Sequence, residues 1–226
     1  MTTAREGGST LNVGSYIMSF GGLDTFGQPV NSVEIFDPRR PLVGWQNVPQ
    51  WSFPRATRDH CTVVTRGQEG PQVMVMGGLG EEVSAMKLVL STNRWFSVPP
   101  LRQARSRHGC TPVTLNGRAG VVVSGGWNID RTNNTDTVEF FDINTHRWVD
   151  LPSLNRGRRG HTMTTIEGQL AVVGGVGNPG LRGEREEILK DVEIFDGRRW
   201  KRAAYGLDRP RNGANLIKIP INTFSG

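Results

Sequence analysis

Three histidines have the residue type and spacing that could bind a metal ion. His60, His108 and His161 each follow arginine-rich sequence and begin a strand-like run, in "RDHCTVV", "RSRHGCTPV" and "RRGHTMTTI". If such units were arranged symmetrically around an axis, the three imidazoles would form a ring, and three imidazoles are a ligand set for zinc or copper. The alternative is that each histidine bonds to the backbone of its own unit. We favour this alternative and predict no metal site.

Three glutamates recur in the same way. Glu34, Glu139 and Glu193 lie in the matching segments "VEIFD", "VEFFD" and "VEIFD". Clustered carboxylates shift one another's pKa and could act as general acids. Their repeated setting favours a plainer role, in which each glutamate accepts hydrogen bonds from an arginine or a backbone amide. Because HExxH, GxSxG and P-loop patterns are also missing, we predict a protein that is not an enzyme and has no cofactor.

The two cysteines, Cys61 and Cys110, both lie in strand-like segments close after a histidine. Two cysteines are a weak basis for a disulfide framework, and small apolar side chains pack well in strands. We therefore expect two free thiols in the core and leave a disulfide as the alternative.

These residues belong to a repeat of about fifty residues. The repeat is marked by four glycine pairs, at Gly21-Gly22, Gly77-Gly78, Gly125-Gly126 and Gly174-Gly175, and by four tryptophans, Trp45, Trp95, Trp148 and Trp200. Each unit contains a strand led by Arg or His, a strand ending in Gly-Gly, a "VEIFD" strand and a strand carrying Trp. The second unit has the degenerate version "MKLVLS" at 86–91. The pattern predicts an all-β chain of four recognisable four-stranded repeats.

The pattern resembles the kelch repeat, whose units form the blades of a β-propeller. The resemblance covers residues 13–219 and includes the glycine pairs, the tryptophans and the Arg/His segments. It implies a single propeller domain over 13–219, with an N-terminal tail at 1–12 and a C-terminal tail at 220–226. Blades of this kind must stack on one another, because one blade cannot bury both of its faces.

The number of strands leaves two arrangements open. The first unit shows no Arg/His-led strand, whereas the chain continues after the fourth unit with "RNGANLIKI" at 211–219. This last strand could pair with the first three and close a ring of four blades. Kelch propellers usually have six or so blades, so the competing hypothesis is an incomplete propeller.

The composition indicates acidic partners. The net charge is +6, and 23 of the 27 basic residues are arginine, whose planar fork suits carboxylates and phosphates. The N-terminus lacks the apolar core of a signal peptide, and no apolar run is long enough for a membrane span. We expect a cytoplasmic protein without membrane contact.

The arginines gather in the connections that lead into the Arg/His strands: "FPRATRDH", "LRQARSRHG", "LNRGRRGH" and "LDRPRNG". Repeat symmetry places these connections on one face of the propeller. We call this predicted partner-binding surface the arginine face, and its residues are Arg55, Arg58, Arg105, Arg107, Arg158, Arg159 and Arg211. The acidic loops after the glycine pairs are expected elsewhere, which would make the molecule electrically asymmetric.

The resemblance also implies a kind of partner. Kelch domains of cullin-dependent ubiquitin ligase adaptors bind acidic degron peptides through arginines that include the one just before the first strand. Arg105, Arg158 and Arg211 match that position, whereas the second unit has Thr57 there. The same adaptors carry BTB and BACK regions, which do not fit into the dozen residues before the first strand, so a ligase role is expected to need a longer form or a partner.

The function predicted from the sequence is a non-enzymatic protein-interaction module that binds an acidic peptide through the arginine face, with substrate recognition for a cullin-type ligase as its extension. One alternative is a propeller that binds RNA or another polyanion, although no RNA-binding motif accompanies the charge, and we do not expect nucleic acid. Another alternative is a kelch-type oxidase or a metal-dependent lyase. With only Tyr16, Tyr205 and four histidines, the chain has too few ligands for an oxidase site.

Overall fold

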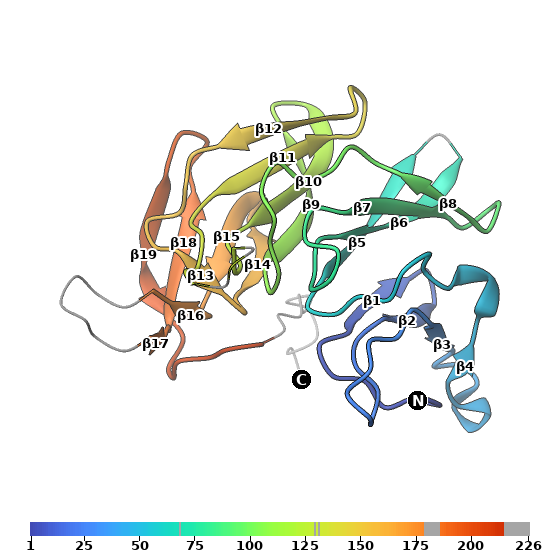
Figure 1. Cartoon of the computed structure of the whole chain (residues 1–226). Helices are drawn as coiled ribbons and strands as arrows, with labels where there is room; N and C mark the ends of the chain where they lie inside the picture. Colours follow the sequence, from blue (N-terminus) through green and yellow to red (C-terminus); the bar gives the residue numbers. More distant parts are fainter. Residues whose placement is uncertain (68, 129, 131, 179–185, 215–226) are drawn as a thin grey trace, which may run out of the picture.

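Four antiparallel sheets of four strands follow one another around a common centre (Figure 1). The computed structural model describes residues 1–67, 69–128, 130, 132–178 and 186–214. Within this part of the chain no helix is long and apolar enough to cross a membrane. The arrangement is that of a β-propeller, as expected from the fifty-residue repeat.

Each sheet forms one blade, and consecutive strands pair with one another. Blade 1 contains β1 (Ser9–Val13), β2 (Tyr16–Phe20), β3 (Val33–Phe36) and β4 (Gln46–Asn47). Blade 2 contains β5 (Cys61–Gly67), β6 (Gly70–Met76), β7 (Ala85–Val89) and β8 (Arg94–Ser97). Blade 3 contains β9 (Gly109–Leu115), β10 (Arg118–Ser124), β11 (Val138–Asp142) and β12 (Arg147–Leu151). Blade 4 contains β14 (Thr162–Ile166), β15 (Gln169–Val173), β18 (Asp191–Phe195) and β19 (Trp200–Gly206).

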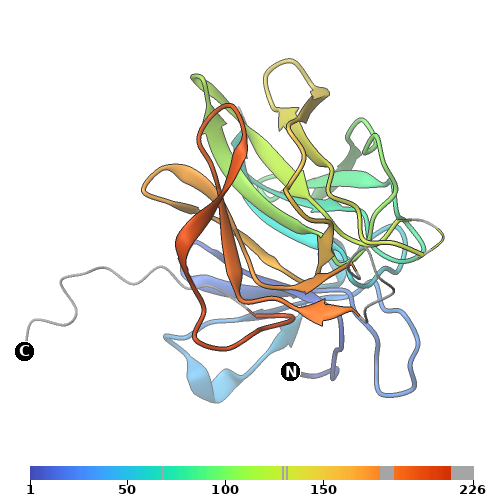
Figure 2. The same cartoon turned by 90° about the vertical axis from the view of Figure 1, so that its left-hand side faces the viewer.

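A small three-stranded sheet accompanies blade 4, with β16 in its centre. Its strands are β13 (Arg158–Arg159), β16 (Val176–Gly177) and β17 (Glu187–Ile188). Two short 3-10 helices, η1 (Pro41–Val43) and η2 (Pro49–Trp51), lie on either side of β4. Figure 2 looks at the molecule from the side of blade 4 and shows the twisted pair β18 and β19 in front.

The second strands of the blades are apolar along their whole length because both of their faces are covered. In β10, Val121 and Val123 pack toward blade 2 and Val122 packs toward blade 4. All three side chains are fully buried. The sequence "VVV" therefore loses the alternation that a strand with one solvent-exposed face would show.

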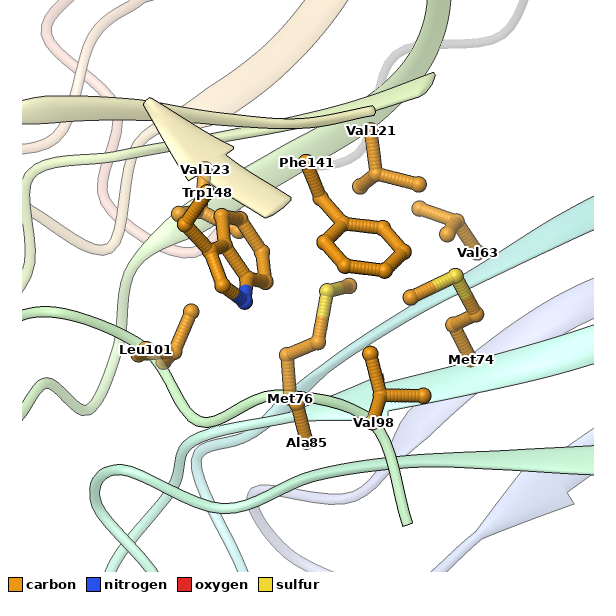
Figure 3. Close-up of a cluster of buried hydrophobic side chains, with 10 residues drawn as sticks. All are labelled: Val63, Met74, Met76, Ala85, Val98, Leu101, Val121, Val123, Phe141 and Trp148. Atoms are coloured by element: carbon orange, nitrogen blue, oxygen red, sulfur yellow. The ribbon is translucent and has the colours of Figure 1, made fainter. Parts of the chain in front are cut away.

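The hydrophobic core consists of three clusters, one between each pair of neighbouring blades. Figure 3 shows the cluster between blades 2 and 3, where Met74 and Met76 of β6 point toward Phe141 and Trp148 of blade 3. The indole Nε1 of Trp148 donates a hydrogen bond to the carbonyl of Pro99, 2.7 Å away. The repeated tryptophan thus fills the space between two blades.

Backbone hydrogen bonds link the innermost strands near the axis. The N–H of Asp59 donates to Gly7, that of Arg107 to Asp59, and that of Gly160 to Arg107, at 2.7, 2.8 and 2.8 Å. All four residues have a left-handed backbone, with φ between +53° and +65°. A non-glycine residue such as Arg107 adopts this conformation at some cost, which the bonds on both sides offset.

Blade 1 supplies its own inner strand, which corrects two predictions. All five residues of β1 pair with β2, from Ser9 opposite Phe20 to Val13 opposite Tyr16. Residues 1–12 are therefore not a tail, and the edge of β2 that 211–219 was expected to occupy is already taken. The strand was missed because "STLNV" contains neither Arg nor His.

Residues 211–214 lie instead beside blade 4, in the position where a further blade would begin. The N–H of Gly213 donates to Gly160 at 2.8 Å, and the carbonyl of Arg211 accepts from Gly175 at 2.7 Å. Neighbouring inner strands contact each other from β1 through β5 and β9 to β14, and the described residues show no comparable contact between β14 and β1. Of the two arrangements, this one matches the incomplete propeller. The rest of the predicted last strand, 215–219, and the predicted tail at 220–226 lie outside the described residues.

Cys61 and Cys110 form a disulfide, so the expectation of two free thiols is wrong. Cys61 is the first residue of β5 and Cys110 is the second residue of β9, and these are the inner strands of blades 2 and 3. Their Cα atoms are 6.1 Å apart, within the range that a disulfide requires. Only the side-by-side packing of the two blades brings together residues that are 49 positions apart in sequence.

Candidate functional site

Two members of the arginine face lie inside the protein, where no partner can reach them. Arg105 and Arg158 both have a relative exposure of 0%. Arg105 Nη2 lies 2.5 Å from Glu139 Oε1, and Arg158 Nη2 lies 2.5 Å from Glu193 Oε1. Their assignment to the partner-binding site is therefore wrong, because each guanidinium turns inward and forms an ion pair with the third strand of its own blade.

The buried arginines also hold the backbone around the glycine pair. Arg105 Nη1 donates to the carbonyls of Gly125 and Thr137, at 2.8 and 3.2 Å. Arg158 Nη1 donates to the carbonyl of Gly174 at 3.0 Å. Burial lowers the pKa of the Arg105 guanidinium, and the attraction of Glu139 acts against that shift. These side chains join the first, second and third strands of their own blade.

Arg5 has the same role in blade 1 and was not singled out from the sequence. Its Nη2 lies 2.9 Å from Glu34 Oε1, and its Nη1 donates to the carbonyls of Gly21 and Ser32, at 2.9 and 3.0 Å. A signal for it existed, because "REGG" at residues 5–8 has the same form as "RNGA" at 211–214. The segment was interpreted as part of an N-terminal tail, because the strand that follows it, "STLNV", contains neither Arg nor His.

The role predicted for the three glutamates is confirmed. Besides its arginine, each carboxylate accepts backbone N–H groups: Glu34 from Thr2 and Thr3, Glu139 from Arg102 and Gln103, and Glu193 from Asn155. Burial by itself would raise the pKa of Glu34. The hydrogen bonds from Thr2, Arg5 and Thr3 outweigh burial, and the pKa of Glu34 is lowered. A carboxylate held in this way stays ionised and is not a general acid.

The other five members of the arginine face are at least partly accessible, and we call them the outer arginines: Arg55, Arg58, Arg107, Arg159 and Arg211. Three of them form ion pairs. Arg55 pairs with Glu81 at 2.9 Å, Arg107 with Asp59 at 3.2 Å, and Arg159 with Glu186. Within the described part of the chain, no ion pair involves Arg58 or Arg211.

The acidic loops lie on the same face as the arginines, which corrects the predicted electrical asymmetry. The loop after each glycine pair bonds to the segment that leads into the first strand of the same blade, as in the bridges Arg58 with Leu79 and Ser106 with Trp127, and in the pairing of β13 with β16. Carboxylates such as Glu81 and Glu186 are thereby brought to the outer arginines. The face is a mosaic of both charges and not a uniform positive surface.

Trp127 lies between two of the outer arginines. The guanidinium carbon of Arg107 is 4.7 Å from the centroid of the indole ring, and that of Arg159 is 4.3 Å away. Arg159 also donates to Asn134 at 3.0 Å. Stacking on an aromatic ring holds a guanidinium in one orientation and leaves its N–H groups available to carboxylates. Trp127 was not predicted as a site residue, although it directly follows a glycine pair.

The three histidines pack between blades and do not bind the backbone of their own unit as predicted. A Cβ on Gly21 would lie 2.8 Å from His60 Cε1, and one on Gly125 would lie 2.7 Å from His161 Cε1. Among the described residues, neither ring nitrogen of His60 has a hydrogen-bond partner, and His161 Nε2 bonds to Ser124 of the preceding blade at 2.9 Å. Burial lowers the pKa of His60 to about 4 and that of His161 to about 3.

A cavity of about 500 Å³ lies on the axis, and residues of all four inner strands line it, together with the histidines and the disulfide. Among the described residues, no group of three or more His, Cys, Asp or Glu is placed to hold a metal ion. His60, His108 and His161 are each turned toward a neighbouring blade, against its glycine pair, which explains why repeat symmetry does not assemble them into a metal site.

The chain was compared with family models and curated proteins. No family model matches it. Kelch-like protein 40 of Xenopus laevis is 26% identical over 160 residues, covering 66% of this chain and 25% of the relative. An F-box/kelch-repeat protein of Arabidopsis thaliana is 26% identical over 179 residues, covering 76% of this chain and 38% of the relative. Beta-scruin of Limulus polyphemus is 24% identical over 187 residues, covering 80% of this chain and 20% of the relative.

The chain spans well under half the length of each of these relatives. The solved structure of YjhT is similar with a TM-score of 0.74 and 16% sequence identity, over 92% of this chain and 72% of that chain. At this identity the likeness concerns the fold.

Proposed function

The chain is a kelch-repeat β-propeller, and from this premise we propose that it is a non-enzymatic module for protein interaction. The proposal is supported by relatives that are kelch-repeat proteins and by a face that presents arginines around a partly exposed aromatic ring. Catalysis needs a nucleophile or a general base in an accessible site. The repeated glutamates are held in buried ion pairs and the repeated histidines are packed between blades, so neither set is available for this work.

The observation that carries the proposed site is the stack of Arg107, Trp127 and Arg159. These residues come from consecutive blades and meet beside the axis. We propose that an acidic segment of a partner protein binds here, with its carboxylates replacing Glu186 and Asp59 as acceptors for the two guanidinium groups. Arginine, tryptophan and tyrosine are also the residues that contribute most to the affinity of protein interfaces.

The proposed site changes which residues belong to the binding surface. The outer arginines remain in it and Trp127 is added, whereas Arg105 and Arg158 belong to the interior of their blades. Each charge-assisted bond to a carboxylate contributes about 1.5 to 3 kcal/mol before desolvation is subtracted. The partner has to compete with the carboxylates already present, which favours a segment with several acidic residues.

Substrate recognition for a cullin-type ubiquitin ligase is the finer form of the proposal. It is supported by the resemblance of the repeats to those of ligase adaptors and by a relative whose name includes an F-box. In this form, the acidic segment is the degradation signal of a substrate protein.

The test is selection from a random peptide library on the folded protein, followed by affinity measurements for the selected peptides. We expect the selected sequences to be enriched in Asp and Glu. Trp127→Ala and the double variant Arg107→Glu/Arg159→Glu should each weaken binding by at least tenfold. Selection of peptides without acidic residues would overturn the proposal.

The matched control is Arg94→Glu/Arg147→Glu, which makes the same change in charge at two exposed arginines that begin β8 and β12. This variant should bind the peptides with unchanged affinity. Equal losses in both double variants, together with a steep salt dependence, would indicate general attraction of polyanions and favour the alternative function of polyanion or RNA binding.

We retain a cytoplasmic location as a proposal, and the disulfide gives a way to test it. Cytosolic thiols are kept reduced, whereas disulfides persist in oxidising compartments. Trapping the thiols of the protein inside its native cells shows whether Cys61 and Cys110 are free there. A fully oxidised pair would argue against the cytoplasm.

A further inference from the structure

Blade 2 lacks the internal ion pair that the other three blades have. The arginine position holds Arg5, Arg105 and Arg158 in blades 1, 3 and 4, and each pairs with a glutamate of the third strand. In blade 2 the arginine position holds Thr57, and the glutamate position holds Met86. Both partners of the pair are replaced together, so the blade is left without a buried unpaired charge.

A cavity of about 440 Å³ lies in blade 2 where the other blades hold this arginine. In blade 3, Arg105 binds Gly125, Thr137 and Glu139. The cavity is lined by the matching residues of blade 2, which are Thr57, Gly77, Ser84 and Met86. Its size falls within the range of about 300 to 1,000 Å³ that is typical of ligand sites.

Blades 2 and 3 also match in the backbone geometry around this position. The N–H of Gly77 donates to the carbonyl of Ser84 at 2.7 Å, as the N–H of Gly125 does to that of Thr137 at 3.0 Å. The acceptors that hold Nη1 and Nη2 of Arg105 in blade 3 therefore have counterparts in the Gly77 carbonyl and in the carbonyl and hydroxyl of Ser84. Within the described part of the chain, the carbonyl of Gly77 accepts no hydrogen bond, although Gly77 is buried.

The remaining walls suit a flat cation with an apolar stem. Phe53 and Trp95 line the cavity and contact each other edge to face, with ring centroids 5.0 Å apart. Val98 adds an apolar surface, and this side chain also reaches the core between blades 2 and 3 (Figure 3). Aromatic faces attract guanidinium groups, and aliphatic walls pack against the methylene groups of a long side chain.

The rim of the cavity supplies the negative charge that Met86 does not. Glu81 lines the cavity, and its Oε1 lies 2.9 Å from Nη1 of Arg55. The Arg55 side chain is 77% exposed, so this surface pair is weak and is easily exchanged for another. A cation entering the cavity would meet Glu81 at its mouth and carbonyl oxygens at its base.

We propose that this cavity in blade 2 binds an arginine side chain of a partner protein. The arginine takes the place that Arg5, Arg105 and Arg158 occupy in the other blades, donating to the Gly77 carbonyl and to Ser84, with its charge balanced by Glu81. Lysine fits less well, because an ammonium group lacks the planar fork that spans these acceptors. The site is separate from the Arg107, Trp127 and Arg159 stack, and its argument does not depend on the acidic partner proposed there.

The direct test is a titration of the folded protein with N-acetyl-arginine methylamide, followed by NMR. The indole N–H of Trp95 and the amides of Gly77 and Ser84 should shift in a saturable manner. The lysine and citrulline analogues should bind at least fivefold more weakly, because the first lacks the fork and the second lacks the charge. Absence of a saturable shift at these residues would overturn the proposal.

The proposal predicts opposite changes in affinity for the arginine probe when the two rim residues, Glu81 and Arg55, are substituted. Glu81→Gln should weaken binding of the arginine probe about tenfold, whereas Arg55→Ala should strengthen it by freeing Glu81. Both residues are partly exposed, so both variants are expected to fold. If the two substitutions changed affinity in the same direction, the assignment of Glu81 as the counter-ion would be wrong.

Substitutions that fill the cavity with side chains of the protein itself provide a further test of where the probe binds. The double variant Thr57→Arg/Met86→Glu introduces the pair used by the other three blades and should abolish the shifts at Gly77 and Ser84. If it fails to fold, Ser84→Ala removes only one hydroxyl acceptor and should weaken binding about threefold. Unchanged affinity in a folded double variant would show that the probe binds elsewhere.

Discussion

At the scale of single residues, the same side chain has different roles according to the direction in which it points. Arg105 and Arg107 are two positions apart, yet the first forms a buried ion pair with Glu139 and the second stacks on Trp127 at the surface. The sequence marks both as basic and cannot separate them. A buried guanidinium is tolerated only when its charge and its N–H groups have partners, so burial requires the matching glutamate.

The buried pair predicts a strong effect for single substitutions and a weaker one for the double substitution. Arg105→Thr or Glu139→Met alone should each cost about 3 to 5 kcal/mol of unfolding free energy, because each leaves a buried charge without its partner. The double variant recreates the residues of blade 2 and should cost less than the sum. Chemical denaturation of the four proteins measures the coupling. Additive costs would show that the pair does not act as a unit.

The buried histidines predict a dependence of stability on pH. The pKa of His60 is lowered to about 4 and that of His161 to about 3, whereas in the unfolded chain both are near 6.5. Between these values the unfolded state binds more protons, so stability should fall as the pH decreases from about 6.5 toward 4. Each histidine contributes a slope of at most about 1.4 kcal/mol per pH unit.

Urea unfolding at pH 7, 6 and 5 measures this slope. His161→Gln should flatten it relative to the wild type. The carboxylates with lowered pKa, such as Glu34, lose their contribution only below their unfolded pKa of about 4.5, so the two effects occupy different pH ranges. A constant stability between pH 7 and 5 would contradict the assignment of neutral buried histidines.

At the scale of elements, each blade is joined to the next through its glycine pair. The second glycine donates to the carbonyl of the arginine position in the following segment, as Gly78 does to Arg105 at 3.0 Å. The first glycine makes room for a histidine of the following blade, as Gly77 does for His108. The glycine pair is therefore an interface between blades and not only a turn, which explains why it recurs with each unit.

Gly77→Ala tests this interface. Gly77 has φ +59°, and an added Cβ would lie 2.6 Å from the carbonyl oxygen of Arg105. The left-handed backbone costs about 1 kcal/mol for alanine, and the backbone clash adds about 1 to 3 kcal/mol. Gly117→Ala is the matched control, because Gly117 has φ +75° and nothing within 4 Å of an added Cβ. Equal losses of stability in the two variants would contradict the proposed packing.

At the scale of the whole molecule, the four blades form an arc. Neighbouring blades are joined by three apolar clusters, a belt of backbone hydrogen bonds and one disulfide. The belt begins at Gly7 and extends to Gly213, beyond the fourth blade. The position after blade 4 therefore presents the same backbone groups that join the other blades. The disulfide joins blades 2 and 3 next to the axis.

The disulfide predicts that reduction lowers stability without changing the fold. A crosslink between residues 49 positions apart stabilises a protein by about 2 to 4 kcal/mol, mainly by restricting the unfolded chain. The oxidised protein should show no free thiols under denaturing conditions, and dithiothreitol should lower its Tm. Cys61→Ser/Cys110→Ser should match the reduced protein and should not respond to dithiothreitol. A response of this variant would point to another cause.

The sequence by itself determined the repeat, the four-stranded units and the family resemblance, because the glycine pairs, tryptophans and "VEIFD" segments recur at an interval of about fifty residues that can be found along the chain alone. It also identified the glutamates as acceptors of hydrogen bonds. Only the tertiary structure decided which arginines are buried, where the acidic loops lie, that blade 1 starts at Ser9, and that Cys61 meets Cys110. These depend on contacts between different strands or blades, and a one-dimensional pattern does not specify on which side of a strand or loop a side chain finds its partner.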